Sequence, residues 1–208
     1  MLEGVEGAGK TTQVSLLSRW LEEQGLRHRT TREPGGTPVG EALRSIVLGR
    51  TDQDISPETE LLTILAARAA FVRDVVKPAL ERGESVVSDR FDLSTFAYQG
   101  WGRGLDLAQL RSMSAFAAGG LTPDLYIVLD VPVEEGTRRQ RQQGKERDRF
   151  EGEGVGFLSR VRDGYLALAG SDSRVRLVDA RGTTDAVHRG VTELLREAFP
   201  ETFPAPDR

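Results

Sequence analysis

A glycine-rich segment near the start of the chain has the residue types and the spacing that bind nucleotide phosphates. Residues 4–11 match the pattern G-x-x-x-x-G-K-[ST], in which glycines let successive backbone N–H groups turn toward a phosphate. The helix predicted after this loop adds its positive N-terminus. We expect Lys10, one of three lysines in the chain, to reach the β- and γ-phosphates, and the Thr11 hydroxyl to bind magnesium. The predicted nucleotide-binding residues of the loop are Gly4, Val5, Glu6, Gly7, Ala8, Gly9, Lys10, Thr11 and Thr12.

A second pair of candidate residues ends a predicted strand. Residues 85–89 are rich in β-forming side chains and end in Asp89, which Arg90 follows. Ligands bind at the carboxyl ends of the strands in open α/β sheets. We therefore expect Asp89 to lie beside the magnesium ion with Thr11. The planar fork of Arg90 is suited to holding two phosphate oxygens of a second substrate.

Two further arginines are candidates for binding an anionic substrate. Arg44 lies on an early predicted helix, and Arg68 lies in the apolar run of residues 64–71. An unpaired charge is costly to bury, so Arg68 is expected to contact an anion or a base. Most of the other arginines are expected on the solvated surface.

The elements that must position these residues follow an alternating order. Short β-rich runs alternate with longer helical patterns, which predicts βαβ units around a parallel sheet. Strands are predicted at residues 28–31, 85–89, 125–130 and 174–178, and helices at 11–24, 38–48, 57–82, 107–118, 133–143, 156–169 and 184–199. The sequence has no repeat or long linker, so one domain is expected over residues 1–208, with a frayed tail at about 200–208.

The first strand is a special case. Only three residues precede Gly4, whereas a typical strand has about five. We expect either a very short first strand or a natural protein that begins upstream, and the second alternative is favoured. In that case this chain is expected to be less stable, because the first strand normally lies mid-sheet.

Composition excludes several classes of protein. The 208 residues include 28 Lys and Arg against 32 Asp and Glu, a net charge of −4, which argues against general binding to nucleic acid. There is no cysteine for a disulfide or a thiolate metal site, and two histidines make a zinc site improbable. No segment is predicted to cross a membrane or to act as a signal peptide, so a cytoplasmic enzyme is expected.

The phosphate loop alone does not distinguish a kinase from a GTPase, a motor or a hydrolytic ATPase. The sequence has no asparagine, so it lacks the N-K-x-D motif that reads guanine. The strand ends at Asp89 and Asp130 also differ from the Asp-Glu pair that usually follows two hydrophobic residues in hydrolytic ATPases.

Taken together, these motifs resemble bacterial thymidylate kinase. The resemblance covers nearly the whole chain in order, through residues 4–12, 31–37, 66–68, 88–100, 123–130 and 148–151. It implies a P-loop NTPase fold of three α/β/α layers with a five-stranded parallel sheet. It also implies transfer of the γ-phosphoryl of ATP to dTMP, with Mg²⁺, by a homodimer, to give dTDP for DNA precursor synthesis.

The resemblance also implies roles for individual residues. Glu6 would lie near the deoxyribose 3′-hydroxyl, and the region of Tyr98 would disfavour a ribose 2′-hydroxyl. Arg44 and Arg90 would grip the 5′-phosphate of dTMP, and Arg68 would hydrogen-bond the thymine edge. The remaining implied contacts are Glu33 near the monophosphate and metal, Ser94, Thr95 and Gln99 at the base and sugar, and Asp179 and Ala180 on the adenine side.

Two features concern the lid and the base. The phosphate loop has no arginine, and families of that type supply a catalytic arginine from a lid, here about residues 138–152. In this segment Arg141, Arg147 and Arg149 are the alternatives for the arginine that reaches the transferred phosphoryl. The predicted catalytic residues are Lys10 and Arg90, together with Arg141 and Arg149. Ile64 stands where the family usually has a phenylalanine that stacks on thymine. Two alternatives therefore stay open: a kinase of another nucleotide, and a nucleotide-dependent switch without an acceptor.

Overall fold

A five-stranded parallel sheet forms the centre of the molecule. The computed structural model describes residues 1–49, 55–142 and 149–204. Within them the strand order is β2-β3-β1-β4-β5, and every pairing is parallel, as the alternation predicted. The strands are β1 (Leu2–Glu3), β2 (His28–Arg32), β3 (Ser85–Asp89), β4 (Tyr126–Asp130) and β5 (Val175–Asp179).

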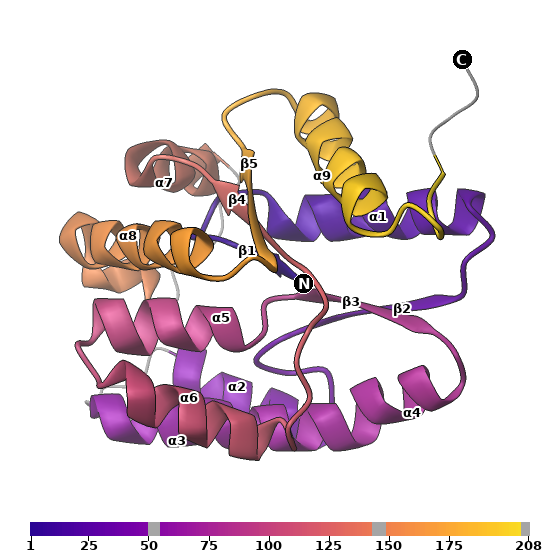
Figure 1. Ribbon diagram of the computed structural model, residues 1–208. Coiled ribbons are helices and arrows are strands. Elements are labelled where there is room, and N and C mark those ends of the chain that lie inside the picture. Colours follow the sequence, from indigo (N-terminus) through magenta and orange to yellow (C-terminus); the bar gives the residue numbers. More distant parts are fainter. Residues whose placement is uncertain (50–54, 143–148, 205–208) are drawn as a thin grey trace.

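Helices cover both faces of the sheet, which gives the three layers of the predicted fold. In Figure 1, α1 (Lys10–Glu23) and α9 (Thr184–Ala198) lie together on one side. The helices α3 (Pro57–Phe71), α4 (Lys77–Glu81), α5 (Asp92–Thr95) and α6 (Leu107–Ala117) lie on the other. The remaining elements are α2 (Pro38–Leu48), packed on α3, then α7 (Val133–Gln142), a 3₁₀ turn (Glu151–Glu153) and α8 (Val155–Ser171).

The first strand is very short, which was one of the two alternatives that the sequence left open. It has two residues, yet it lies mid-sheet, where Leu2 pairs with both Asp89 of β3 and Ile127 of β4. The β4 strand is buried along Tyr126–Leu129, because helices cover both its faces. The carboxyl ends of β1 and β3 therefore lie side by side, which places the phosphate loop next to Asp89 and Arg90.

Two helical segments differ from the sequence-based prediction. The helix predicted at residues 57–82 contains a π-helical segment, η1 (Val72–Val76), just before Pro78, which has no N–H to continue the α-helical ladder. Residues 92–102, to which no helix was assigned, form α5 and a second π-helical segment, η2 (Phe96–Gly102). Helix α8 packs closely on η2: a Cβ on Gly164 would lie 2.7 Å from the Trp101 ring.

The end of the described chain also differs from the expected frayed tail. Phe203 is buried, and its ring lies 4.7 Å from that of Trp20 on α1. Residues 205–208 lie outside the described residues. The hydrophobic contact at Phe203 explains why the chain stays packed beyond α9.

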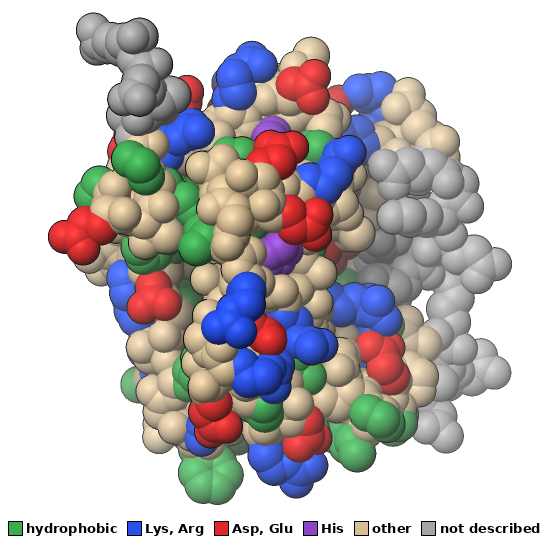
Figure 2. All heavy atoms as spheres, turned by 90° about the vertical axis from the view of Figure 1, so that its right-hand side faces the viewer, with side chains coloured by type: hydrophobic (Ala, Val, Ile, Leu, Met, Phe, Trp, Pro, Cys, Tyr) green, Lys and Arg blue, Asp and Glu red, His purple; other side chains and the backbone are tan. Residues whose placement is uncertain are grey.

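The surface carries charges of both signs. On the face shown in Figure 2, acidic and basic side chains are interspersed. Near the β2 edge of the sheet, Arg29 and Arg82 both pair with Glu84. No helix in the described part of the chain has the length and apolar character needed to cross a membrane.

Candidate active site

One cleft of about 370 Å³ at the carboxyl end of the sheet brings most of the predicted site residues together. The predicted residues that line it are Glu6, Gly7, Gly9, Lys10, Thr11, Thr12, Glu33, Arg44, Ile64, Arg68, Asp89, Arg90, Ser94, Thr95, Tyr98 and Gln99. The other lining residues, which were not predicted, are Arg32, Pro34, Leu48, Phe91, Gln140 and Phe150. The cleft thus runs from the phosphate loop to a buried region under α3 and η2.

The phosphate loop has the backbone geometry that its glycines predict. Gly7 has φ 74° and lies so close to α7 that a Cβ there would be 2.1 Å from the carbonyl oxygen of Gly136. The Nζ of Lys10 donates to the carbonyl oxygens of Gly4 (3.0 Å) and Val5 (2.9 Å). Burial, and next the charge of Arg90, lower the pKa of Lys10 below its usual value. These contacts hold the ammonium group inside the loop.

The predicted metal ligands are already in contact. The Thr11 hydroxyl donates to Oδ2 of Asp89 at 2.8 Å, so the start of α1 and the end of β3 meet at one point. Hydroxyl and carboxylate oxygens are the donors that Mg²⁺ prefers, and Mg²⁺ commonly takes few protein ligands beside substrate phosphates. The two residues therefore fit a magnesium ion.

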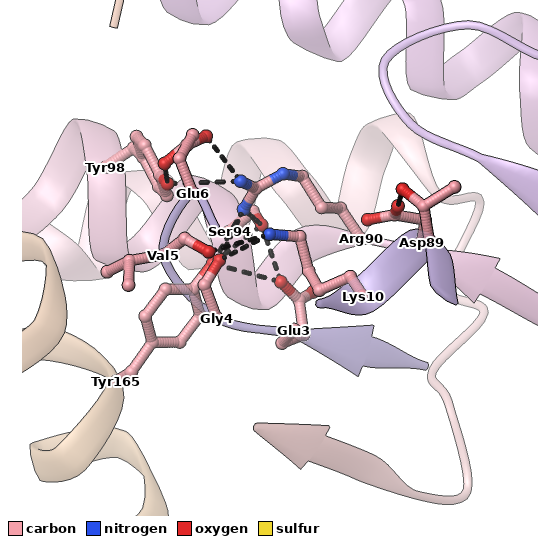
Figure 3. Close-up of polar contacts among 11 residues, drawn as sticks. Glu3, Gly4, Val5, Glu6, Lys10, Asp89, Arg90, Ser94, Tyr98 and Tyr165 are labelled. Atoms are coloured by element: carbon pink, nitrogen blue, oxygen red, sulfur yellow. Dashed lines mark hydrogen bonds and ion pairs between the residues drawn. The ribbon is translucent and has the colours of Figure 1, made fainter. Parts of the chain in front are cut away.

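Arg90 is the centre of a buried polar cluster, drawn in Figure 3. It has φ 76°, in the left-handed region, and its backbone N–H donates to the Leu2 carbonyl at 2.9 Å. Its guanidinium group donates to Oε1 of Glu6 at 2.5 Å and to the Gly4 carbonyl at 3.0 Å. It also donates to the hydroxyls of Ser94 (3.0 Å), Tyr98 (3.1 Å) and Tyr165 (3.2 Å). The cluster ties the end of β3 to the phosphate loop.

Glu6 is the acidic member of this cluster. Both Arg90 and the Tyr98 hydroxyl donate to its carboxylate. Burial alone raises the pKa of Glu6, but the charges of Arg90 and Lys10 outweigh it, so that the pKa lies below its usual value. Glu6 therefore remains an anion beside the cleft.

Two members of the cluster were missed in the sequence. Glu3 is fully buried, and its carboxylate accepts from Ser94 (2.5 Å), the Phe91 N–H (2.8 Å) and Tyr165 (3.1 Å). Burial raises the pKa of Glu3. A carboxylate in a predicted central strand is the signal that could have marked Glu3. Tyr165 lies on the buried face of α8, where the sequence alone does not distinguish it from a core residue.

The far end of the cleft contains a buried ion pair. Nε of Arg68 donates to Oε2 of Glu33 at 2.9 Å, and its other nitrogens donate to Ser114 (3.0 Å) and the Phe91 carbonyl (3.1 Å). Arg68 is 1% exposed and Glu33 3%. Burial raises the pKa of Glu33 to about 7, although Arg68 opposes this shift. The guanidinium group of Arg68, which the sequence predicted to contact an anion or a base, is thus paired with Glu33 inside the protein.

Two polar atoms at this end have no hydrogen-bond partner among the described residues. They are Oε1 of Glu33 and Oγ1 of Thr95, and both belong to residues that line the cleft. Buried polar atoms are normally paired, so these two atoms are suited to meeting a polar ligand. Near them, Arg44 donates to the Pro34 carbonyl at 2.7 Å, and Ile64 is buried in the wall.

The structure does not bring Arg141 or Arg149, the predicted lid arginines among the described residues, into the cleft. Arg141 is exposed on α7, and Arg149 donates to the Val47 carbonyl (2.9 Å) and to Glu60. Arg147 lies outside the described residues. Gln140 and Phe150, from the two flanks of residues 143–148, line the cleft.

The predicted adenine-side residues lie apart from the described lining of the cleft. Asp179 pairs with Arg181 at 2.7 Å, and the Ala180 carbonyl accepts from Arg139 of α7 at 2.9 Å. This contact ties the loop after β5 to α7. Of the phosphate-loop residues, Gly4, Val5 and Ala8 are not among the residues that line the cleft.

Comparison with known proteins identifies the family. A family model described as thymidylate kinase matches residues 2–191. The chain belongs to the thymidylate kinase family. The thymidylate kinase of Alkalilimnicola ehrlichii is 46% identical over 198 residues, which cover 95% of this chain and 91% of that protein. The thymidylate kinase of Pseudoalteromonas translucida is 44% identical over 201 residues, or 97% and 96% of the two chains.

A solved structure agrees. The thymidylate kinase of Ehrlichia chaffeensis superposes with a TM-score of 0.74 at 28% identity, over 93% of this chain and 96% of that one. Membership in the thymidylate kinase family makes this chain a nucleoside monophosphate kinase, which is a transferase acting on dTMP with ATP as donor. The resemblance found in the sequence, the parallel α/β fold and the kinase class are thereby confirmed.

Proposed function

We propose that this thymidylate kinase holds ATP on the phosphate loop and dTMP in the buried end of the same cleft, and that the residues named below transfer the γ-phosphoryl between them. The observation that carries the proposal is the continuity of the cleft. Lys10 and Thr11 line one end of it, and Arg68, Thr95 and Gln99 line the other. A donor and an acceptor can therefore lie end to end in it.

The donor side consists of the phosphate loop and the proposed metal ligands. On binding, the ATP phosphates replace the Gly4 and Val5 carbonyls as partners of Lys10. Thr11 and Asp89 hold Mg²⁺, directly or through water. When bound, the ion neutralises charge on the β- and γ-phosphate oxygens. The backbone N–H groups of the loop supply the remaining contacts.

The acceptor side uses arginines. Arg44 and Arg90 bind the 5′-phosphate of dTMP, and Arg90 extends to the transferred group. Phosphoryl transfer passes through a loose transition state with charge on the equatorial oxygens, so fixed guanidinium groups stabilise it. No protein base is required, because the acceptor phosphate is an anion at neutral pH.

The base lies at the buried end. Arg68 meets the thymine edge, Ser94, Thr95 and Gln99 contact the base and sugar, and Ile64 replaces ring stacking with aliphatic contact. Glu33 lies near the monophosphate and metal. Glu6 and Tyr98, bound to each other, lie at the deoxyribose, and their close contact leaves little room for a 2′-hydroxyl.

A lid arginine completes the proposed site. Arg141 or Arg149 closes over the γ-phosphate and excludes water, which otherwise competes as acceptor. In the described state Arg149 is bound to Glu60, so this role requires that contact to open. Asp179 and Ala180 are proposed on the adenine side, next to α7.

The decisive test is the variant Arg90→Ala. Removing an arginine that stabilises the transferred phosphoryl costs about 10³-fold or more in rate. We expect that loss in a coupled assay with dTMP and ATP, with thermal unfolding recorded to show that the variant folds. Arg73→Ala, which removes an exposed arginine paired with Asp74, is the matched control and is expected to keep full activity. Near-native turnover by Arg90→Ala would refute the assignment.

The acceptor also needs a direct test, because Ile64 differs from the phenylalanine usual in the family. The same assay with dTMP, dUMP, dCMP, dGMP and thymidine compares the candidates. We expect dTMP to have the highest kcat/KM. Slow ATP hydrolysis that dTMP does not change would support a switch without an acceptor instead.

We also propose that the enzyme is a cytoplasmic homodimer. Large hydrophobic side chains are exposed on the adjoining helices α2, α3 and α6: Val39, Ile46, Leu62 and Phe116, the last 90% exposed. Such a group of apolar side chains is typical of an interface between subunits. Light scattering after size exclusion is expected to give twice the chain mass.

A further inference from the structure

Glu60 is a fully buried carboxylate to which the reaction as proposed gives no role. It lies near the start of α3, with a side chain that is 0% exposed. Three side chains from two segments bind it: Gln99 through Nε2 at 2.7 Å, Arg103 through Nη2 at 2.9 Å, and Arg149. A buried charge needs such partners, and here Gln99 comes from η2, Arg103 from the residue after it, and Arg149 from the proposed lid segment.

These contacts determine the orientation of the Gln99 amide. Because Glu60 accepts from two guanidinium groups, both of its oxygens act as acceptors. Gln99 must therefore turn its NH₂ group toward Glu60, and its carbonyl Oε1 is the polar atom that remains. Gln99 lines the cleft, whereas Glu60 is not among the described residues that do so. The carbonyl of Gln99 is thus presented to a ligand as a hydrogen-bond acceptor.

Arg68, also in the wall of the cleft, offers hydrogen-bond donors, whereas Gln99 offers an acceptor. A guanidinium group has five N–H donors and no acceptor. Glu33, Ser114 and the Phe91 carbonyl take three of these donors and hold the group in place. The buried end of the cleft therefore offers one fixed acceptor and one fixed donor group.

This pair is complementary to one kind of pyrimidine edge. An imide edge, as in thymine or uracil, has a ring N–H beside a carbonyl, which matches an acceptor beside a donor. The edge of cytosine has a ring nitrogen acceptor beside an amino donor, which meets the same pair with both polarities reversed. Mispaired buried polar groups are costly, so the orientation of Gln99 decides which base is accepted.

We propose that Glu60 is a positioning residue that sets the selectivity of this enzyme for an imide base over an amino base, by holding Gln99 with its carbonyl toward the base. The proposal rests on the proposed function, because it takes the base to lie between Gln99 and Arg68. Arg103 and Arg149 compensate the charge of Glu60, and Arg103 pairs in addition with Glu153 at 2.7 Å. Through Arg149, the same carboxylate links the base pocket to the end of the lid.

The test compares two substrates that differ at the base edge alone, dTMP and 5-methyl-dCMP. In Glu60→Gln the new amide can accept or donate, so Gln99 can turn either way. We expect the ratio of kcat/KM for dTMP over 5-methyl-dCMP to fall about tenfold or more relative to the native enzyme. The control variant Glu153→Gln removes the other partner of Arg103 and leaves Glu60 in contact with Gln99, so its ratio is expected to stay native.

Glu60→Asp is the conservative variant. It keeps two acceptor oxygens and is expected to retain more of the dTMP preference than Glu60→Gln. A ratio in Glu60→Gln within twofold of native, however low the total activity, would show a purely structural role and overturn the proposal. An equal loss of preference in Glu60→Asp and Glu60→Gln would do the same.

A measurement on the native enzyme keeps the proposal testable if Glu60→Gln does not fold. In a crystal structure with dTMP, Gln99 must lie within hydrogen-bond distance of Glu60 and of the thymine ring N–H at once. Separation of Gln99 from Glu60 in that complex would refute the proposal. Failure of the native enzyme to phosphorylate dTMP would instead refute the proposed function, so the two failures are distinguishable.

Discussion

The buried pair of Glu33 and Arg68 predicts a pH dependence of stability that one substitution can isolate. Burial raises the pKa of Glu33 to about 7 from its usual 4.5, against the opposing charge of Arg68. Asp92 and Glu3 also act to raise it. Between these two pKa values, the folded state therefore holds a proton that the unfolded state has lost.

The sign and size of the effect follow from linkage. A carboxyl with a raised pKa in the folded state contributes stability that is fully present below the unfolded pKa, and this stability is lost as the pH rises through the folded pKa. A pKa difference of about 2.5, at 1.36 kcal/mol for each pKa unit, amounts to about 3 kcal/mol. Glu33→Gln cannot titrate and lacks this contribution. The native advantage over Glu33→Gln in the free energy of unfolding should therefore shrink by about 2 kcal/mol between about pH 5 and pH 8.

Urea denaturation of both proteins at a series of pH values measures this difference directly. Glu33→Gln also changes the hydrogen bond to Arg68 and so shifts the stability by a constant amount, but the slope of the difference with pH carries the test. Glu84→Gln is the control, because Arg82 lowers the pKa of Glu84 and its titration falls below this range. Stability curves for native protein and Glu33→Gln that run parallel from pH 5 to pH 8 would refute the reasoning.

Three further predictions concern other parts of the molecule. Phe203→Ala is expected to destabilise the protein by about 3 kcal/mol, measured by denaturant unfolding, because the buried ring packs on Trp20. Gly7→Ala is expected to weaken ATP binding in calorimetry and to lower the melting temperature, since its φ of 74° and the 2.1 Å approach to Gly136 exclude a Cβ. A native affinity for ATP in that variant would contradict the close contact between the phosphate loop and α7. Thr11→Val is expected to raise the Mg²⁺ concentration needed for half-maximal activity about tenfold or more, and an unchanged requirement would remove Thr11 from the metal site.

The elements with strong local patterns were predictable from the sequence. The phosphate loop, the strands β2 to β5 and the helix after the loop lie where periodicity and motif spacing placed them. Residues 92–102 were not, because their aromatic, β-branched and glycine residues have poor helix propensity. Packing against α8 stabilises this segment as α5 and η2, and a single-sequence pattern does not contain that contact.

The residues that hold the site together were the hardest to find. Ser94 and Tyr165 bind Glu3 across sequence separations of 91 and 162 residues, and Gln99 binds Glu60 across 39. Glu60 looks in the sequence like an ordinary acidic residue, and only a place in the predicted first strand marks Glu3. Their importance arises from burial, which no local spacing indicates.

The sequence by itself determined that this chain binds nucleotide phosphates on a parallel α/β sheet, because a loop motif and an alternation of elements are properties of neighbouring residues. The sequence also indicated Arg44, Arg68 and Arg90 as site residues, but only the tertiary structure decided the places of the other arginines and the partners of each. Arg32 also lines the cleft, whereas Arg149 is bound to Glu60. The physical reason is that a buried charge stays where groups from distant segments compensate it, and those groups come together only when the chain folds.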